Sequence, residues 1–153
     1  MTSKFVATIV AAWLCGGYAM AADGLTSRAS RFFPAETVER LEAEIRAKGM
    51  TVFARIDHAA GAKEAGLTLR PTVVVIFGNA RAGTPLMQAN QEIGIDLPLK
   101  ALVWEDAAGK TWLAYSDPHW LAKRHGLGAE PTRIVDAMAA ALNAVAKKAT
   151  GSD

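Results

Sequence analysis

The segment Arg70–Asp106, RPTVVVIFGNARAGTPLMQANQEIGIDLPLKALVWED, contains two apolar strand candidates joined by a capped helix. Thr72–Phe77 is a β-branched run without polar alternation, a pattern typical of a central strand that is buried on both faces. Gly78 and Asn79 end this strand, and Leu99–Glu105 forms the second strand candidate. We therefore predict that the rest of the chain packs around this strand, helix and strand.

A helix within this segment is expected to begin at Thr84, with Thr84 as the capping residue and Pro85 at the first helical position. The preceding loop has the spacing G-x-x-x-x-G followed by Thr, but it lacks the lysine of a phosphate-binding loop, so nucleotide binding is not expected. The helix start would instead offer unpaired amides to a small anion or carboxylate, with Arg81 as a countercharge. A plain turn before a capped helix is the alternative. The predicted ligand-binding residues are Asn79, Arg81, Gly83, Thr84 and Asp96.

The composition indicates one globular domain. The chain has 153 residues, of which 51% are hydrophobic and 21% charged, and splitting it in two would leave each half too small for a good core. The formal net charge is only +2, and the aromatic residues are not interleaved with Lys or Arg. Nucleic acid is therefore not an expected partner.

The first 21 residues have the pattern of a secretory signal peptide. A start containing Lys4 precedes the apolar stretch Phe5–Leu14, and Ala19–Ala21 has the A-x-A form of a cleavage site. The apolar stretch is shorter than the roughly 20 residues that a membrane-spanning helix needs. We expect cleavage after Ala21, a periplasmic or secreted protein, and no stable membrane insertion afterwards. A retained anchor and lipidation at Cys15, the single cysteine, are the alternatives.

Beyond the signal peptide, residues 22–33 are polar and aperiodic and are expected to form a flexible lead-in. A single domain should follow over residues 34–148, with a frayed tail at 149–153. Apolar periodicity, caps, and proline and glycine positions predict its other elements. These are a helix over Pro34–Lys48, a strand over Thr51–Asp57, a short helix over His58–Ala65 capped by Asp57, a strand over Thr111–Tyr115, a helix from Asp117 and Pro118 to Gly126, and a long helix over Thr132–Lys147.

Three stretches match a known family in order and with compatible spacing. They are FARIDHAAGAKEAGLTLRPTVVVIFGNARAGTPLMQ (53–88), IDLPLKALVWED (95–106) and YSDPHWLAKRHGL (115–127). The chain resembles the family called domain of unknown function 302 from about Ala35 to Leu127. The residues that match its recurrent motifs are Asp57, His58, Pro71, Phe77, Gly78, Asn79, Gly83, Thr84, Asp96, Leu97, Pro98, Tyr115, Pro118 and His125. The chain departs from the family pattern at Gly61 and Ala80.

This resemblance implies a compact α+β domain with a small sheet, and it implies a homodimer, but it brings no known activity. Together with the periodicity, it predicts a sheet of about four strands packed by helices, with a long C-terminal helix.

No metal or cofactor is expected. His119 and His125 lie on one predicted helix at a spacing that turns them to different faces, and His58 would need ligands from elsewhere. The chain also has no haem attachment site and no nucleophile elbow.

The prediction for function is a cofactor-free module that binds a small ligand or another protein. The alternative is a small hydrolase or lyase that uses Asp57, His58 and Asp96 as acid and base groups, with Tyr115 or Thr84 as a hydrogen-bond donor. No spacing in the sequence forces these residues together, so we favour binding over catalysis.

Overall fold

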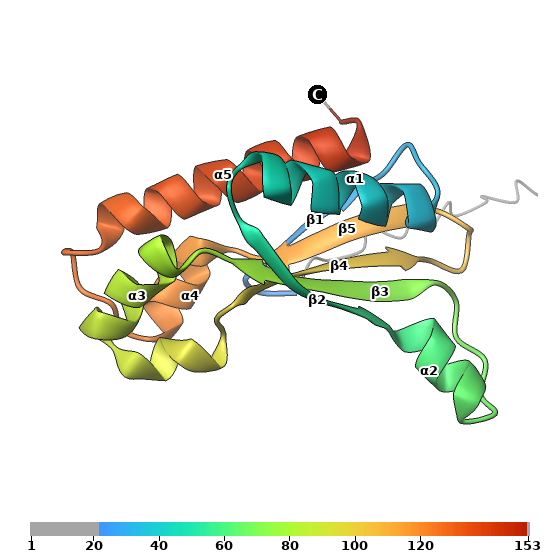
Figure 1. Cartoon of the computed structure of the whole chain (residues 1–153), viewed down its shortest axis with the longest axis horizontal. Helices are drawn as coiled ribbons and strands as arrows, with labels where there is room; N and C mark the ends of the chain where they lie inside the picture. The colour runs from blue at the N-terminus through green and yellow to red at the C-terminus, as the bar shows by residue number, and fades with distance from the viewer. Residues whose placement is uncertain (1–21, 153) are drawn as a thin grey trace, which may run out of the picture.

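The computed structural model describes residues 22–152, which form one antiparallel sheet with helices on one face and at both ends (Figure 1). The strands lie in the order β1-β5-β4-β3-β2. They are β1 (Leu25–Ala29), β2 (Thr51–Asp57), β3 (Thr72–Gly78), β4 (Leu99–Glu105) and β5 (Thr111–Ser116). The helices are α1 (Pro34–Ala47), α2 (His58–Glu64), α3 (Ala80–Ala89), the 3-10 helix η1 (Gln91–Ile95), α4 (Pro118–Arg124) and α5 (Thr132–Thr150). The α+β class and the long C-terminal helix are as predicted, with five strands instead of about four.

Helices α1 and α5 cover one face of the sheet. The apolar stripe of α1, made by Val38, Leu41 and Ile45, is at most 1% exposed and packs in the same core as the sheet. Pro34 occupies the first turn of α1, where its missing amide hydrogen leaves no bond unmade. The predicted helix from Pro34 is confirmed and ends at Ala47.

No helix within residues 22–152 lies on the other face of the sheet, and β3 is not fully buried on both faces as expected. Val73 and Val75 point into the core and are buried, whereas Val74 and Ile76 alternate to the uncovered face and are only half-buried. The uninterrupted apolar run of β3 therefore belongs to an antiparallel sheet that has helices packed on one face. Its second face is apolar and is left without a helix by the part of the chain that the structure describes.

Residues 22–33, expected to be a flexible lead-in, contain the edge strand β1. Leu25–Ala29 pairs antiparallel with β5, from Leu25 opposite Ser116 to Ala29 opposite Trp112. The stretch is short and polar because an edge strand needs few apolar side chains. Its backbone hydrogen bonds to β5 hold it in place.

The expected frayed tail is also ordered over most of its length. Helix α5 continues to Thr150, which is fully buried, and the Thr150 carbonyl accepts a hydrogen bond of 3.0 Å from the Arg31 amide. Gly151 then ends the helix with a φ of 67°, in the left-handed region that glycine adopts without strain. Two segments far apart in the sequence therefore meet beside α1.

Helix α3 begins five residues before the predicted position, and Asn79, not Thr84, is its cap. The Asn79 side chain accepts a hydrogen bond of 2.8 Å from the Arg81 amide, and Pro85 lies inside the helix. Proline lacks an amide donor, which led to its assignment at the helix start. Within α3 the same lack leaves one helical bond unmade.

The two ends of the sheet carry different helices. Helix α2 extends from the end where β2 stops and β3 starts, and α3, η1 and α4 lie at the opposite end (Figure 1). Asp57 caps α2 as predicted, since its Oδ1 accepts a 2.9 Å hydrogen bond from the Ala60 amide. Among residues 22–152, no helix has both the length and the apolar character needed to cross a membrane. The predicted signal peptide lies outside the described residues.

Candidate functional site

The acid and base candidates are not brought together. Asp57 pairs with Val73 at one end of β3, and Leu99, just after Asp96, pairs with Phe77 at the other. An extended strand rises about 3.3 Å per residue, so these two ends lie about 13 Å apart. His58 is exposed on α2, on the far side of Asp57. The three predicted groups therefore do not converge on one substrate.

Asp96 instead forms a local pair near α4. Its Oδ2 lies 2.6 Å from His125 Nε2 and 3.6 Å from Arg124 Nε. The His125 carbonyl also accepts a 2.7 Å hydrogen bond from Asn90. This network connects the loop before β4 to the end of α4. Asp96 is thus near the predicted binding loop in sequence but engaged in a structural contact.

Tyr115 is buried at 7% exposure and lines a separate hollow with His119. In this hollow His119 lies between two carboxylates, 2.9 Å from Asp136 and 3.2 Å from Asp117. The hydrogen bond to Asp136 is the main cause that raises the pKa of His119 above its ordinary value, and Asp117 adds to it. Within residues 22–152, no cluster of three or more His, Cys, Asp or Glu side chains could hold a metal ion.

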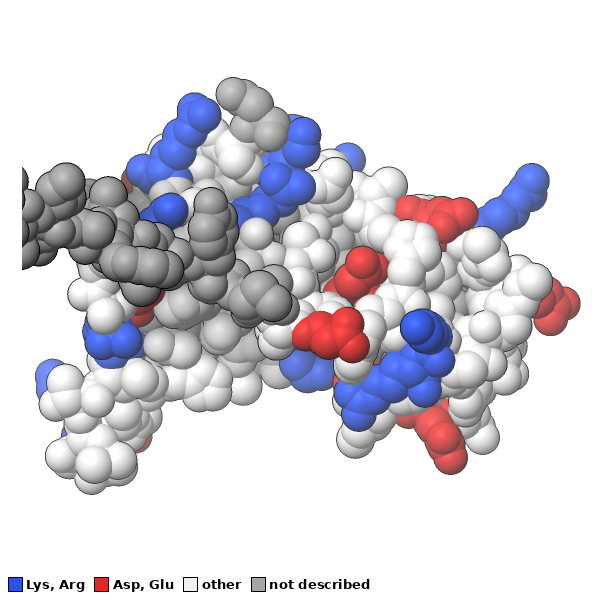
Figure 2. Space-filling view, turned by 180° about the vertical axis from the view of Figure 1, so that it is seen from behind, with Lys and Arg blue, Asp and Glu red and all other residues white. Residues whose placement is uncertain are grey.

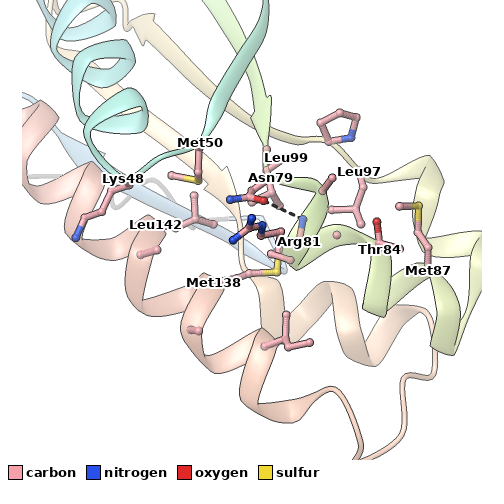
Figure 3. Close-up of a pocket in the computed structure, with 18 of the residues that line it drawn as sticks. Lys48, Met50, Asn79, Arg81, Thr84, Met87, Leu97, Leu99, Met138 and Leu142 are labelled. Atoms are coloured by element: carbon pink, nitrogen blue, oxygen red, sulfur yellow. Dashed lines mark hydrogen bonds between the residues drawn. The ribbon is translucent and has the colours of Figure 1, made fainter.

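A cavity lies where α3, α5 and the end of the sheet meet (Figure 3). It has a volume of about 680 Å³, which falls within the roughly 300–1,000 Å³ typical of small-ligand sites. Four of the five predicted ligand-binding residues, Asn79, Arg81, Gly83 and Thr84, line it; Asp96 does not.

Small residues on the two facing helices leave this space open. On α3 the wall includes Ala82 and Gly83, and on α5 it includes Ala137 and Ala141. Side chains of this size cannot fill the distance between two helices at ordinary packing separation. Leu142, which is 3% exposed, contributes to the buried part of the wall.

The lining is apolar with basic residues and no acidic ones. Its larger apolar side chains are Met50, Phe53, Met87, Leu97, Leu99, Ile134, Met138 and Leu142. Three cations also line it: Lys48 at the end of α1, Arg81 in the first turn of α3 and Arg133 in the first turn of α5. Within residues 22–152, none of the three side chains makes an ion pair or a hydrogen bond. The cavity therefore combines an apolar interior with unpaired positive charge.

The amides at the start of α3 are less available than the sequence suggested. The Arg81 amide donates to the Asn79 side chain, and the amides of Ala82 and Gly83 donate to the Asn79 carbonyl at 3.0 and 2.9 Å. Binding of an anion by free amides at Thr84 is therefore excluded, because Thr84 is inside the helix. The positive charge of the site comes from side chains.

Sequence reasoning missed most of this site. Lys48, Met138 and Arg133 come from segments far from the Gly78–Thr84 loop, and only the fold brings them beside it. Their own signals are weak: Lys48 follows a surface helix, and Met138 belongs to an ordinary apolar stripe. The paired small residues Ala137 and Ala141 on α5 were the signal most likely to reveal a gap between helices.

Comparison with known proteins finds relatives by sequence and by structure. The chain is 52% identical over 129 residues to a protein named fluoride-specific ion channel FluC 1 from Brucella suis, covering 84% of this chain and 51% of that protein. A protein of the same name from Brucella abortus is also 52% identical over 129 residues, with 48% of its length covered. The chain thus spans about half the length of these curated relatives, and channel activity is a property named for those whole proteins.

A solved structure shares the fold. It is described as the crystal structure of uncharacterized conserved protein DUF302 from Bacillus stearothermophilus, and it superposes with a TM-score of 0.75 at 22% identity, covering 84% of this chain and 99% of that one. The model of the family described as domain of unknown function DUF302 matches residues 26–146, which confirms the resemblance found in the sequence. The chain belongs to the DUF302 family.

Proposed function

We propose that this protein is a binding module that holds a small, largely apolar ligand in the cavity between α3, α5 and the sheet. The observation that carries the proposal is the cavity itself, about 680 Å³ in volume and lined mainly by apolar side chains. Apolar surface that remains in contact with water is unfavourable, and a ligand that replaces that water gains the corresponding transfer free energy.

The wall also favours binding over catalysis. Its uncharged polar side chains are Asn79 and Thr84, and the Asn79 oxygen is already occupied by the Arg81 amide. A general acid or base needs a titratable side chain within hydrogen-bond reach of the reacting group. Among residues 22–152, neither a histidine nor a carboxylate lines this cavity.

A filled cavity tests the proposal. Ala141→Phe places a ring in the space between α3 and α5 and should abolish saturable binding of the neutral dye N-phenyl-1-naphthylamine, measured by fluorescence. Ala140→Phe is the matched control, because Ala140 is the next residue on α5 and does not line the cavity. Equal dye binding by both variants would show that the dye binds elsewhere and would overturn the proposal.

A homodimer, which the family resemblance implies, is also proposed, and the uncovered sheet face supports it. Val74, Ile76 and Leu102 are half-buried apolar residues on this face, and Trp104 and Trp112 stack there with ring centroids 6.3 Å apart. Aromatic residues are enriched at interfaces. Sedimentation velocity should show a dimer that Leu102→Lys dissociates; a monomeric unsubstituted protein would refute the proposal.

Export is proposed from the N-terminal pattern, so that the ligand would be met in the periplasm or outside the cell. The charged start, apolar stretch and A-x-A site together support cleavage after Ala21. Mass spectrometry of exported material should find Ala22 at the N-terminus. Accumulation of a form that begins with Met1 in the cytoplasm would contradict this.

A further inference from the structure

We propose that the ligand of this cavity is a single-chain amphiphile with an anionic head group, whose alkyl tail contacts the apolar wall and whose head lies among Lys48, Arg81 and Arg133. This inference rests on the proposed binding function and names the chemical class of the ligand. Three properties of the wall support it: its charge, the kind of apolar side chain in it, and the scarcity of directed polar groups.

Within the part of the chain that the structure describes, Lys48, Arg81 and Arg133 are not held in ion pairs, whereas Arg46 and Lys148 are. Arg46 lies 2.8 Å from Glu42, and Lys148 lies 3.4 Å from Glu44. Lys48, Arg81 and Arg133 have no such partner among residues 22–152, and no Asp or Glu lines the cavity.

On the right-hand part of the face seen from behind, Lys and Arg lie beside Asp and Glu (Figure 2). Charges of one sign around a low-dielectric concavity focus the electrostatic potential and raise the local concentration of ligands of opposite charge. The cavity therefore favours an anion.

Arg81 is well placed to contact the head group. Figure 3 shows its side chain extending from α3 in the direction of Met138 and Leu142 on α5, while its amide is held by Asn79 (dashed line). A guanidinium presents a planar fork of donors that matches the oxygens of a carboxylate or a phosphate. Lys48 and Arg133 add charge from two other elements.

The apolar wall fits a flexible tail better than a rigid ring system. Met50, Met87 and Met138 all line the cavity, and methionine side chains repack around ligands of different shape. Sugars and nucleosides present many hydrogen-bonding groups, and burying such groups without partners is costly. A wall with only Asn79 and Thr84 as uncharged polar side chains cannot supply those partners. An alkyl chain demands none.

The test compares ligands that share one tail and differ in the head. Isothermal titration calorimetry is carried out on the full chain with decanoate, decyl phosphate, decanol, decyltrimethylammonium and the short anion butyrate. The charged decyl ligands are kept below their micelle-forming concentrations and decanol below its solubility limit. Decanoate or decyl phosphate should bind most tightly and decyltrimethylammonium least. Comparing decanoate with decyl phosphate distinguishes a carboxylate from a phosphate head group.

Substitution of one cation should act on the anionic ligand alone. Arg81→Gln should raise the Kd of the preferred anionic probe about fivefold, which corresponds to the roughly 1 kcal/mol of one exposed charge pair. The Kd of decanol should not change. Unchanged decanol binding also shows that the variant is folded. The matched control is Arg55→Gln on β2, which removes an exposed arginine outside the cavity and should change neither affinity.

The outcomes separate the two proposals. Decanol binding as tight as decanoate and decyl phosphate, or no effect of Arg81→Gln on the preferred anion, would overturn the anionic head while leaving an apolar binding site. Butyrate binding as tight as decanoate would overturn the alkyl tail. Absence of binding for every decyl ligand would overturn the proposed function itself.

Discussion

Shortening a valine on each face of β3 measures how the sheet is covered. Val75 is 0% exposed and lies in the core with α1, whereas its neighbour Val74 is half-buried on the face without a helix. Val75→Ala removes two buried carbon atoms, worth about 0.8 kcal/mol each in transfer free energy, and leaves a cavity that adds to the loss. The expected cost is about 2–3 kcal/mol of unfolding free energy, against about 1 kcal/mol or less for Val74→Ala.

The pair of variants isolates burial from other effects. Both remove a β-branched residue from the same central strand, so any loss of strand propensity is common to both. If the two variants unfold in urea with the same m-value, their midpoints give the difference in unfolding free energy between them. A cost at Val74 within about 0.5 kcal/mol of that at Val75 would mean that both faces of β3 are equally buried and would refute the single helical layer.

Two further predictions concern titrating groups. Asp136, and after it Asp117, stabilises the imidazolium form of His119, so Asp136→Asn should lower the pKa of His119 toward its ordinary value of 6.5 in an NMR titration. The stability that the His119–Asp136 pair contributes is present at low pH and is lost as the pH rises through the raised pKa of His119. The hydrogen bond from Trp112 Nε1, 2.8 Å long, is the first cause that lowers the pKa of Asp106 below its ordinary 3.8. Trp112→Phe should therefore raise the pKa of Asp106. In the unsubstituted protein, the contribution of Asp106 to stability is present above its ordinary pKa and is lost as the pH falls through its lowered pKa. An unchanged pKa in either variant would show that the named hydrogen bond is not its cause.

Much of the fold could be predicted because its signals are local. Strand β4 was placed at the observed bounds from its apolar run, and Asp117 was recognised as a cap because proline follows it. Strand β1 escaped prediction because its sequence, LTSRA, has no apolar periodicity, and its pairing partner β5 lies far along the chain. The apolar run of β3 was correctly assigned to a strand, but a sequence run cannot show that only one face would receive helices.

The site was predicted in part for the same reason. The loop from Gly78 to Thr84 is a local feature and does line the cavity. Arg133 and Met138 reach the cavity only because α5 returns across the sheet, and the small residues Ala137 and Ala141 beside Met138 are the one local sign of a gap there. The assignment of Asp96 to the site failed because its carboxylate is held by His125, a contact between separate segments.

The most direct test of the binding site uses methionine methyl groups as reporters. Of the five methionines in the chain, Met50, Met87 and Met138 line the cavity, while Met1 and Met20 belong to the proposed signal peptide, which cleavage after Ala21 would remove. In ¹³C-methyl-methionine NMR spectra of the protein that begins at Ala22, added decanoate should shift the three cavity signals together and saturably. In the Ala141→Phe variant, whose cavity is filled, the same addition should leave these signals unchanged. Saturable decanoate binding with those three signals unmoved would place the ligand elsewhere and contradict the account.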